Sequence, residues 1–257
     1  MELSTLLLLC AAALGVAAVV VASGFGLGTA LTPLFLLTYD IKTAILLVAV
    51  VHFANNLFRL ALFRRSVDGS IVRRFGLASV VGAVVGSLLQ KYAGEPGLEL
   101  GLGALLVVLG GVEFLPGRPR TQKPACAGKL RGRGWRIPRR VDQAGGFLSG
   151  LLGGLMGNQG AIRSGYLLNY GLSKDAFIAT GTAIACLIDA SRIPVYLFNY
   201  GAGLVSSWPY LVAVIGAALT GTLVGRRLVA RLTLAWFRSL VAGLIALVGT
   251  VLIFTNL

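Results

Sequence analysis

Charged residues are scarce in this chain, and acidic residues are the scarcest of them. Charged residues make up 12% of the 257 residues and only nine are Asp or Glu, whereas hydrophobic residues make up 56% and the mean hydropathy is +0.86. A soluble domain would carry more charge. Apolar runs of about 20 residues recur along the chain, long enough for helices that cross a bilayer, and they lack the alternation of a membrane barrel. The sequence therefore predicts an all-α polytopic membrane protein.

Signatures of catalysis and of metal binding are also missing. The sequence contains no HExxH, GxSxG, Walker A or CxxC motif. Its three cysteines, Cys10, Cys126 and Cys186, are odd in number and lack metal-ligand spacing, so we expect neither a metal site nor a structural disulfide. A membrane-embedded enzyme would need a nucleophile with its base, or a metal cluster. We therefore predict a protein that is not an enzyme and that binds no cofactor.

The formal net charge of +14 comes from basic residues in the polar stretches. In a soluble protein this excess would suggest a nucleic-acid partner, but in a membrane protein Lys and Arg collect in cytoplasmic loops. We therefore expect no nucleic acid and place the basic loops 64–74 and 117–141 on the cytoplasmic side. The acidic loop 91–99 and the uncharged stretch 199–207 are predicted to lie outside. The chain is predicted to be a multi-pass protein of the cell membrane.

Eight apolar segments are predicted, and two of them, 5–37 and 143–170, are long and interrupted by glycines. The loop charges place both ends of segment 143–170 on the cytoplasmic side, and two full spans would need about 40 residues. We therefore predict a re-entrant hairpin in this segment and, by internal similarity, in segment 5–37. The alternative is one straight crossing by each segment. The other segments are 43–63, 75–92, 98–115, 176–198, 205–225 and 233–255.

The two halves of the chain resemble each other in colinear order. Asn56-x-x-Arg59 matches Asp189-x-x-Arg192, and GAVVG (82–86) matches GTLVG (221–225). A hairpin plus three transmembrane helices crosses the membrane an odd number of times, so the two repeats would be inverted, as in many secondary transporters. Gly82, Gly86, Gly221 and Gly225 are expected in close helix packing. The predicted units are a first membrane repeat (1–116), a basic linker (117–141) and a second membrane repeat (142–257).

Glycines mark the predicted tips of both hairpins, in ASGFGLGTALTPLF (22–35) and GGLMGNQGA (153–161). Alternate glycines share no helix face, so they indicate an unwound backbone, with close packing as the alternative. Irregular backbone at membrane depth is tolerated only inside protein or beside a wet cavity. Half-helices that start near Gly28 and Gly160 would point free N–H groups at one central site for an oxyanion. The candidate residues are Ser23, Gly24, Gly26, Gly28, Thr29, Gly157, Asn158, Gln159 and Gly160.

Two further pairs, Asn56 with Arg59 and Asp189 with Arg192, have i, i+3 spacing inside apolar segments. Ionisable groups in a membrane are costly and favour the interior or a cavity. We predict that all four residues lie in the substrate site. The arginines would hold the anion, and Asp189 would exchange the protons that serve as the coupling ion. The structural alternatives are a neutralising Asp189–Arg192 pair and an Arg59 that reaches the interface.

Two other ionisable residues allow more than one interpretation. His52, the only histidine, is either a proton relay or a hydrogen-bonded packing residue, and base rates favour the second role. Arg163, on the rising arm of the second hairpin, either lines the inner path or reaches the interface.

These features resemble the sulfite exporter TauE/SafE family of membrane permeases. The resemblance is carried by ASGFGLGTALTPLFLL, by GGFLSGLLGGLMGNQGAIRSGYLL, by TGTAIACLIDASRIPVYL and by the basic central loop, and it covers nearly the whole chain. It implies export or uptake of small sulfur oxyanions or organosulfur anions such as sulfite and sulfoacetate. NQGAIRSG departs from the glycine-rich turn and proline of many relatives, which changes the donors offered to the anion.

The sequence thus predicts a secondary transporter that binds a small anion at mid-membrane and works by alternating access. A passive anion channel would share the site but lack a coupled step. A non-transporting membrane scaffold would instead use its basic loop to bind a cytoplasmic partner or anionic lipid.

Overall fold

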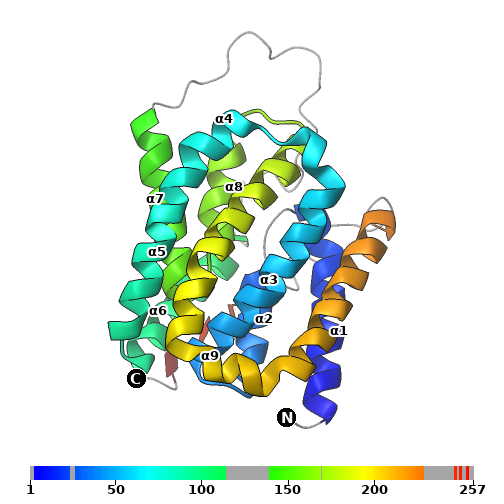
Figure 1. Ribbon diagram of the computed structural model, residues 1–257, viewed down its shortest axis with the longest axis vertical. Helices are drawn as coiled ribbons and strands as arrows, with labels where there is room; N and C mark the ends of the chain where they lie inside the picture. Colours follow the sequence, from blue (N-terminus) through cyan, green and yellow to red (C-terminus); the bar gives the residue numbers. More distant parts are fainter. Residues whose placement is uncertain are drawn as a thin grey trace.

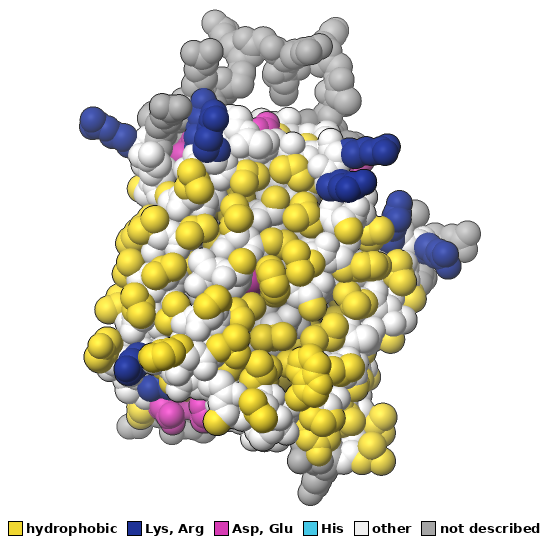
Figure 2. Space-filling model, in the orientation of Figure 1, with side chains coloured by type: hydrophobic (Ala, Val, Ile, Leu, Met, Phe, Trp, Pro, Cys, Tyr) yellow, Lys and Arg dark blue, Asp and Glu magenta, His cyan; other side chains and the backbone are white. Residues whose placement is uncertain are grey.

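The computed structural model is helical throughout its described part and contains no strand there. It describes residues 3–23, 27–113, 139–168 and 170–228, together with residues 246, 247, 249, 250, 253 and 254. Apolar side chains cover the middle of the visible face, and Lys and Arg lie toward its ends (Figure 2). Three described helical stretches are long and apolar enough to cross a bilayer: Ile41–Ser66, Gly69–Tyr92 and Asp175–Arg227. These features fit the predicted helical membrane protein.

Nine α-helices make up most of the described chain (Figure 1). Polar side chains cap the N-termini of some of these helices. Before Ile41–Phe63, the Asp40 carboxylate accepts hydrogen bonds from the backbone N–H groups of Lys42 (3.1 Å) and Thr43 (2.9 Å). The helices are α1 (Leu3–Ser23), α2 (Leu27–Phe35), α3 (Ile41–Phe63), α4 (Gly69–Ile71), α5 (Leu77–Tyr92), α6 (Glu95–Glu113), α7 (Arg139–Met156), α8 (Gly160–Leu168) and α9 (Lys174–Leu228).

Two predicted loops are wrong in extent. Most of the basic stretch 64–74 is helical, because a 3-10 turn, η1 (Arg64–Ser66), and a π-helical turn, η2 (Val72–Gly76), continue α3 and lead into α5. The stretch 199–207 lies within α9, where Tyr200 alone has non-helical angles (φ −134°, ψ 17°). Figure 1 shows α9 turning back at this bend. One residue with non-helical angles redirects the chain, so no loop is needed there.

The two glycine-broken segments form helical hairpins. α1 ends at Ser23 and α2 begins at Leu27, while α7 ends at Met156 and α8 begins at Gly160. Within each hairpin the two helices contact each other. Figure 1 shows α1 starting at the end of the molecule where the N-terminus lies, and α7 starting at the opposite end. The helix breaks thus lie where the glycines predict them, and both hairpins bend inside the molecule.

Glycines allow the first helix of each hairpin, α1 or α7, to pack closely on a helix from the other half of the chain. A Cβ on Gly82 would lie 2.1 Å from the carbonyl oxygen of Phe147 on α7, and one on Gly225 would lie 1.9 Å from that of Ala18 on α1. Gly86 and Gly221 make similar approaches. Only glycine allows such backbone contact. The packing role predicted for these four glycines is therefore confirmed.

Replacement of Gly150 by Ala should destabilise the protein. Gly150 faces α5 from α7, and a Cβ there would lie 1.9 Å from the carbonyl oxygen of Ser79, so the two helices must move apart. We expect a loss of about 2 kcal/mol or more, which exceeds the helix-propensity gain of about 1 kcal/mol. Thermal unfolding of the detergent-purified protein measures the change.

Gly216→Ala is the matched control, because a Cβ at Gly216 on α9 has no atom within 4 Å. We expect this variant to unfold at the wild-type temperature or above it. Equal unfolding temperatures for the two alanine variants would contradict the close α5–α7 contact.

Candidate functional site

The start of α2 meets the bend of the second hairpin inside the molecule. The Thr29 hydroxyl, on α2, donates a hydrogen bond to Oδ1 of Asn158, which lies between α7 and α8. A Cβ on Gly28 would lie 3.5 Å from the carbonyl oxygen of Gly157. Gly157 has φ +78°, a left-handed conformation that glycine adopts without strain. Four predicted tip residues from distant parts of the chain therefore lie together.

The first turns of α2 and α8 also start at this meeting point. Because the first N–H groups of a helix have no partner within it, both turns direct donors and a positive dipole end toward the tips. Gly160 is the first residue of α8, and Ser23 is the last residue of α1; the side chain of Ser23 is not described. The predicted Gly24 and Gly26 lie outside the described residues.

The carboxylate of Asp189 connects three parts of the chain. Its Oδ1 accepts hydrogen bonds from Gln159 Nε2 (2.9 Å) and from Nε (3.0 Å) and Nη2 (2.8 Å) of Arg192. Its Oδ2 lies 2.6 Å from Nδ1 of His52. Asp189 has 0% exposure. This carboxylate therefore holds α3, the second hairpin tip and α9 together.

Arg192 is fully engaged in this cluster. In addition to its two hydrogen bonds to Asp189, its Nη1 donates to the carbonyl oxygen of Gly153 near the end of α7. Its guanidinium carbon lies 5.8 Å from the ring centre of Tyr196. The structure thus contains the neutralising Asp189–Arg192 pair, and three of the five N–H donors of this arginine bind Asp189 and the second hairpin.

His52 contacts Asp189 and Asn56 through its ring nitrogens. Its Nδ1 lies 2.6 Å from Oδ2 of Asp189 and 3.0 Å from Nδ2 of Asn56, and its Nε2 lies 3.2 Å from the same amide nitrogen. The ring therefore lies between the carboxylate on α9 and an amide of its own helix. Asn56 therefore serves in the structure as the partner of His52.

Arg59 and Arg163 are buried with the same cluster. Each is 2% exposed, so the structure does not place Arg59 at the interface. Nη1 of Arg163 donates to Oε1 of Gln159 at 3.2 Å, and its Nε is buried with no hydrogen-bond partner among the described residues. The predicted site omits Arg163, although its i, i+4 spacing from Gln159 was a signal that could have included it.

Buried basic side chains gather near the Asp189 carboxylate. Of the nine acidic residues in the chain, only Asp142 and Asp189 are buried among those the structure describes, and Asp142 accepts a hydrogen bond from the Tyr170 hydroxyl. Asp189 is bonded directly to Arg192 and, through Gln159, to Arg163. An arginine at the centre of a membrane helix costs about 3 kcal/mol, so this environment favours an anion.

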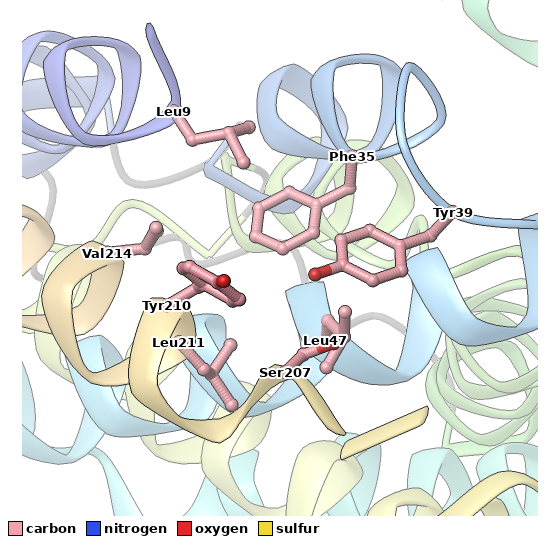
Figure 3. A pocket seen from close by; sticks show the side chains of 8 residues that line it. All are labelled: Leu9, Phe35, Tyr39, Leu47, Ser207, Tyr210, Leu211 and Val214. Atoms are coloured by element: carbon pink, nitrogen blue, oxygen red, sulfur yellow. The ribbon is translucent and has the colours of Figure 1, made fainter. Parts of the chain in front are cut away.

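A separate hollow lies away from these charges. It is a shallow, partly open hollow with about 190 Å³ of empty space between α1, the α2–α3 region and the second arm of α9, and none of the predicted site residues line it (Figure 3). Its lining is mostly apolar. The charged cluster itself is buried on all sides, so a solute could reach it only after helices move. The lining residues are Leu9, Phe35, Tyr39, Leu47, Ser207, Tyr210, Leu211 and Val214.

Comparison with known families agrees with this architecture. The model of the family described as sulfite exporter TauE/SafE matches residues 9–252. The chain belongs to the sulfite exporter TauE/SafE family. Searches of curated proteins and of solved structures gave no match. TauE/SafE proteins are membrane permeases rather than enzymes, so the chain is an integral membrane protein of a transporter family. The family expected from the sequence is thus confirmed.

Replacement of Asp189 by Asn should strongly destabilise this TauE/SafE protein. The change leaves Arg192 buried without its counter-charge. Removal of one partner of a buried ion pair costs about 3–5 kcal/mol. Thermal unfolding of the purified protein measures the effect, and Asp175→Asn, at an exposed position near the start of the same helix, is the control. An Asp189→Asn variant as stable as this control would contradict the central role of the carboxylate.

Proposed function

We propose that the chain is a secondary transporter that moves a small anion across the cell membrane by alternating access. The substrate class is a sulfur oxyanion or an organosulfonate, such as sulfite or sulfoacetate. The observation that carries this proposal is that two buried arginines, Arg163 and Arg192, are connected to Asp189 close to two hairpin tips that direct helix N-termini to one place. Membership of the TauE/SafE family supports the substrate class.

The proposed architecture consists of two inverted membrane repeats, 1–116 and 142–257, with a linker at 117–141. Three features support it. The hairpins start from opposite ends of the molecule (Figure 1). GAVVG (82–86) packs on the first arm of the second hairpin, and GTLVG (221–225) packs on the first arm of the first hairpin. Such reciprocal packing is what a two-fold axis in the membrane plane would produce.

The proposed orientation places loops 64–74 and 117–141 in the cytoplasm. Arg64, Arg65, Arg73 and Arg74 lie around the turn between α3 and α5, and Lys and Arg gather toward that end of the visible face (Figure 2). Basic residues near membrane ends favour the cytoplasmic side. Under this orientation, the second hairpin enters from the cytoplasm and the first enters from outside.

Alternating access follows from the burial of the charged cluster. The two tips touch through Thr29 and Asn158, whereas each first arm is fixed by close glycine contacts to a helix of the other half. We propose that the α1–α9 and α5–α7 units move as bodies and that the tip contact opens on one side at a time. The anion would bind at the cluster between these movements.

Protons are the proposed coupling ion, and Asp189 is the proposed group that exchanges them. Its carboxylate accepts hydrogen bonds from Gln159 and Arg192 and contacts His52. Transfer of a proton to this carboxylate would weaken these contacts between α3, α9 and the second hairpin tip.

Counterflow into proteoliposomes tests the proposed function. Vesicles that contain the purified protein and are preloaded with unlabelled sulfite should accumulate radiolabelled sulfite transiently, because a carrier exchanges solute across the membrane. Protein-free vesicles should show no such uptake. A channel would give flux that preloading does not accelerate, and a scaffold would give no flux of sulfite or sulfoacetate.

The matched variants are Arg59→Gln and Arg73→Gln, which remove the same charge from a buried and an exposed position. We expect counterflow to be lost in the first variant and unchanged in the second. Full counterflow in a folded Arg59→Gln variant would remove this arginine from the site.

A further inference from the structure

A hydrogen bond joins the two arms of the second hairpin at the end opposite its tip, where α7 begins and α8 ends. The hydroxyl of Tyr170, just after α8, donates to Oδ1 of Asp142 in the first turn of α7. The backbone N–H of Tyr170 bonds to the carbonyl oxygen of Leu167 (3.2 Å), so this tyrosine continues the last turn of α8. Gly171 follows with φ +62° and turns the chain toward α9.

An apolar layer separates this hydrogen bond from the charged centre. Arg163, Leu167 and Tyr170 follow one another along α8 at spacings of four and three residues, which places them on one side of the helix. Leu167 is buried in a cluster with Phe75 of η2 and Ile184 of α9, and Tyr170 packs against this cluster. A solute that moved along α8 from the centre would therefore meet the apolar layer before it reached the end of the hairpin.

The ring of Tyr166 connects this layer to both arms of the hairpin. Its centre lies 5.4 Å from that of the Phe75 ring. A Cβ on Gly145, one turn after Asp142 on α7, would lie 2.2 Å from the Tyr166 ring, so this glycine lets the ring lie against the α7 backbone. The layer is therefore complete only while α7 and α8 stay together at this end.

Polar contacts hold this end of the hairpin less firmly than they hold the charged centre. Asp142 has 0% exposure, and its Oδ2 is buried without a hydrogen-bond partner among the described residues. Asp189, in contrast, is bonded through both of its oxygens. A buried carboxylate oxygen without a partner is costly, and this cost opposes the gain from the Tyr170 hydrogen bond. A small net free energy is what a part that opens and closes requires.

We propose that the Tyr170–Asp142 hydrogen bond is the latch of a gate on the cytoplasmic side of the transport site. The gate is the apolar layer formed by Phe75, Tyr166 and Leu167. This inference rests on the proposed function and orientation and deepens them. When the latch is released, the end of α8 moves away from α7, and the layer separates.

α8 is the arm that moves. The backbone of α7 lies directly against η2 and α5, because Cβ atoms on Gly146 and Gly150 would lie 2.3 Å and 1.9 Å from the carbonyl oxygens of Phe75 and Ser79. The shorter α8 packs mainly on α7 and α9. Motion of α8 therefore leaves the close contact between α7 and α5 intact.

The first hairpin has no matching pair of residues, so the latch belongs to one side of the membrane. When Gly28 is aligned with Gly160, Cys10 takes the position of Asp142, and Thr38 takes the position of Tyr170. The latch should accordingly control access from the cytoplasm and leave access from outside unchanged.

Cys186 serves as a reporter for opening of the gate. It lies on α9 one turn before Asp189 and is 7% exposed, and the changes Cys10→Ser and Cys126→Ser make it the sole cysteine. The full-length chain in this background is tested in inside-out and right-side-out vesicles. The anionic, membrane-impermeant thiol reagent sulfonatoethyl methanethiosulfonate is added outside the vesicles. Mass spectrometry of the purified protein then gives the rate of labelling from each side.

Tyr170→Phe removes the latch hydroxyl and keeps the ring. Loss of a hydrogen bond to an ionised carboxylate favours the open gate, so we expect Cys186 to be labelled from the cytoplasmic side roughly tenfold faster or more. Labelling from outside should not change. Addition of Asp142→Asn should give no further increase, because both changes act on one contact. Tyr166→Phe is the matched control and should be labelled at the wild-type rate, since the described contacts of Tyr166 are made by its ring.

The opposite results have distinct meanings. Wild-type labelling rates in Tyr170→Phe would overturn the latch, while counterflow by the wild type still supported transport. Faster labelling from outside alone would place the gate on the wrong side, and equally faster labelling from both sides would indicate general loosening of the fold; either result would also overturn the proposal. A wild-type protein without counterflow would instead contradict the proposed function itself.

Discussion

The buried centre of this protein depends on the contacts of a single carboxylate. Asp189 binds Arg192 through two nitrogens, accepts from Gln159 and contacts His52, and it thereby links α9 to α8 and α3. At membrane depth no bulk water is present to solvate charges, so each buried arginine needs a counter-charge or an anion. Asp189 is bonded to Arg192 and, through Gln159, to Arg163, and this buried group of positive side chains is the basis of the proposed transport function.

Backbone constraints bring these side chains to one place. The start of α2, after the first glycine-broken stretch, meets the bend of the second hairpin through Thr29 and Asn158. Close glycine contacts fix α7 against α5 and α1 against α9. Residues far apart in sequence therefore share one buried site, and the helices that carry it belong to both halves of the chain. This arrangement suits a family whose members move sulfite and related anions, because helix N-termini and arginine side chains both attract anions.

Much of this fold could be predicted from local sequence. Alternate glycines predicted both helix breaks, small-residue spacing predicted the packing of Gly82 and Gly225, and hydropathy predicted the membrane helices. The errors arose where tertiary contacts decide. The chain turns at Tyr200, directly before Gly201, within one continuous α9 rather than in a loop, and the contacts of Asp189 with His52 and Gln159 join residues 137 and 30 positions apart. Sequence spacing showed the Asp189–Arg192 pair but not the bonds from Gln159 to Asp189 and from Arg163 to Gln159, and the predicted site omitted Arg163.

The central claim is that the buried centre near Asp189 holds an anion. The most direct measurement is anomalous X-ray diffraction from crystals of the protein grown with selenate, an oxyanion analogue of sulfate whose selenium can be located unambiguously. The account predicts a selenium peak in this buried centre, beside the two hairpin tips, with the Asp189–Arg192 pair intact. Crystals that bind selenate only at surface lysines or arginines, with the buried centre lacking a peak, would contradict it.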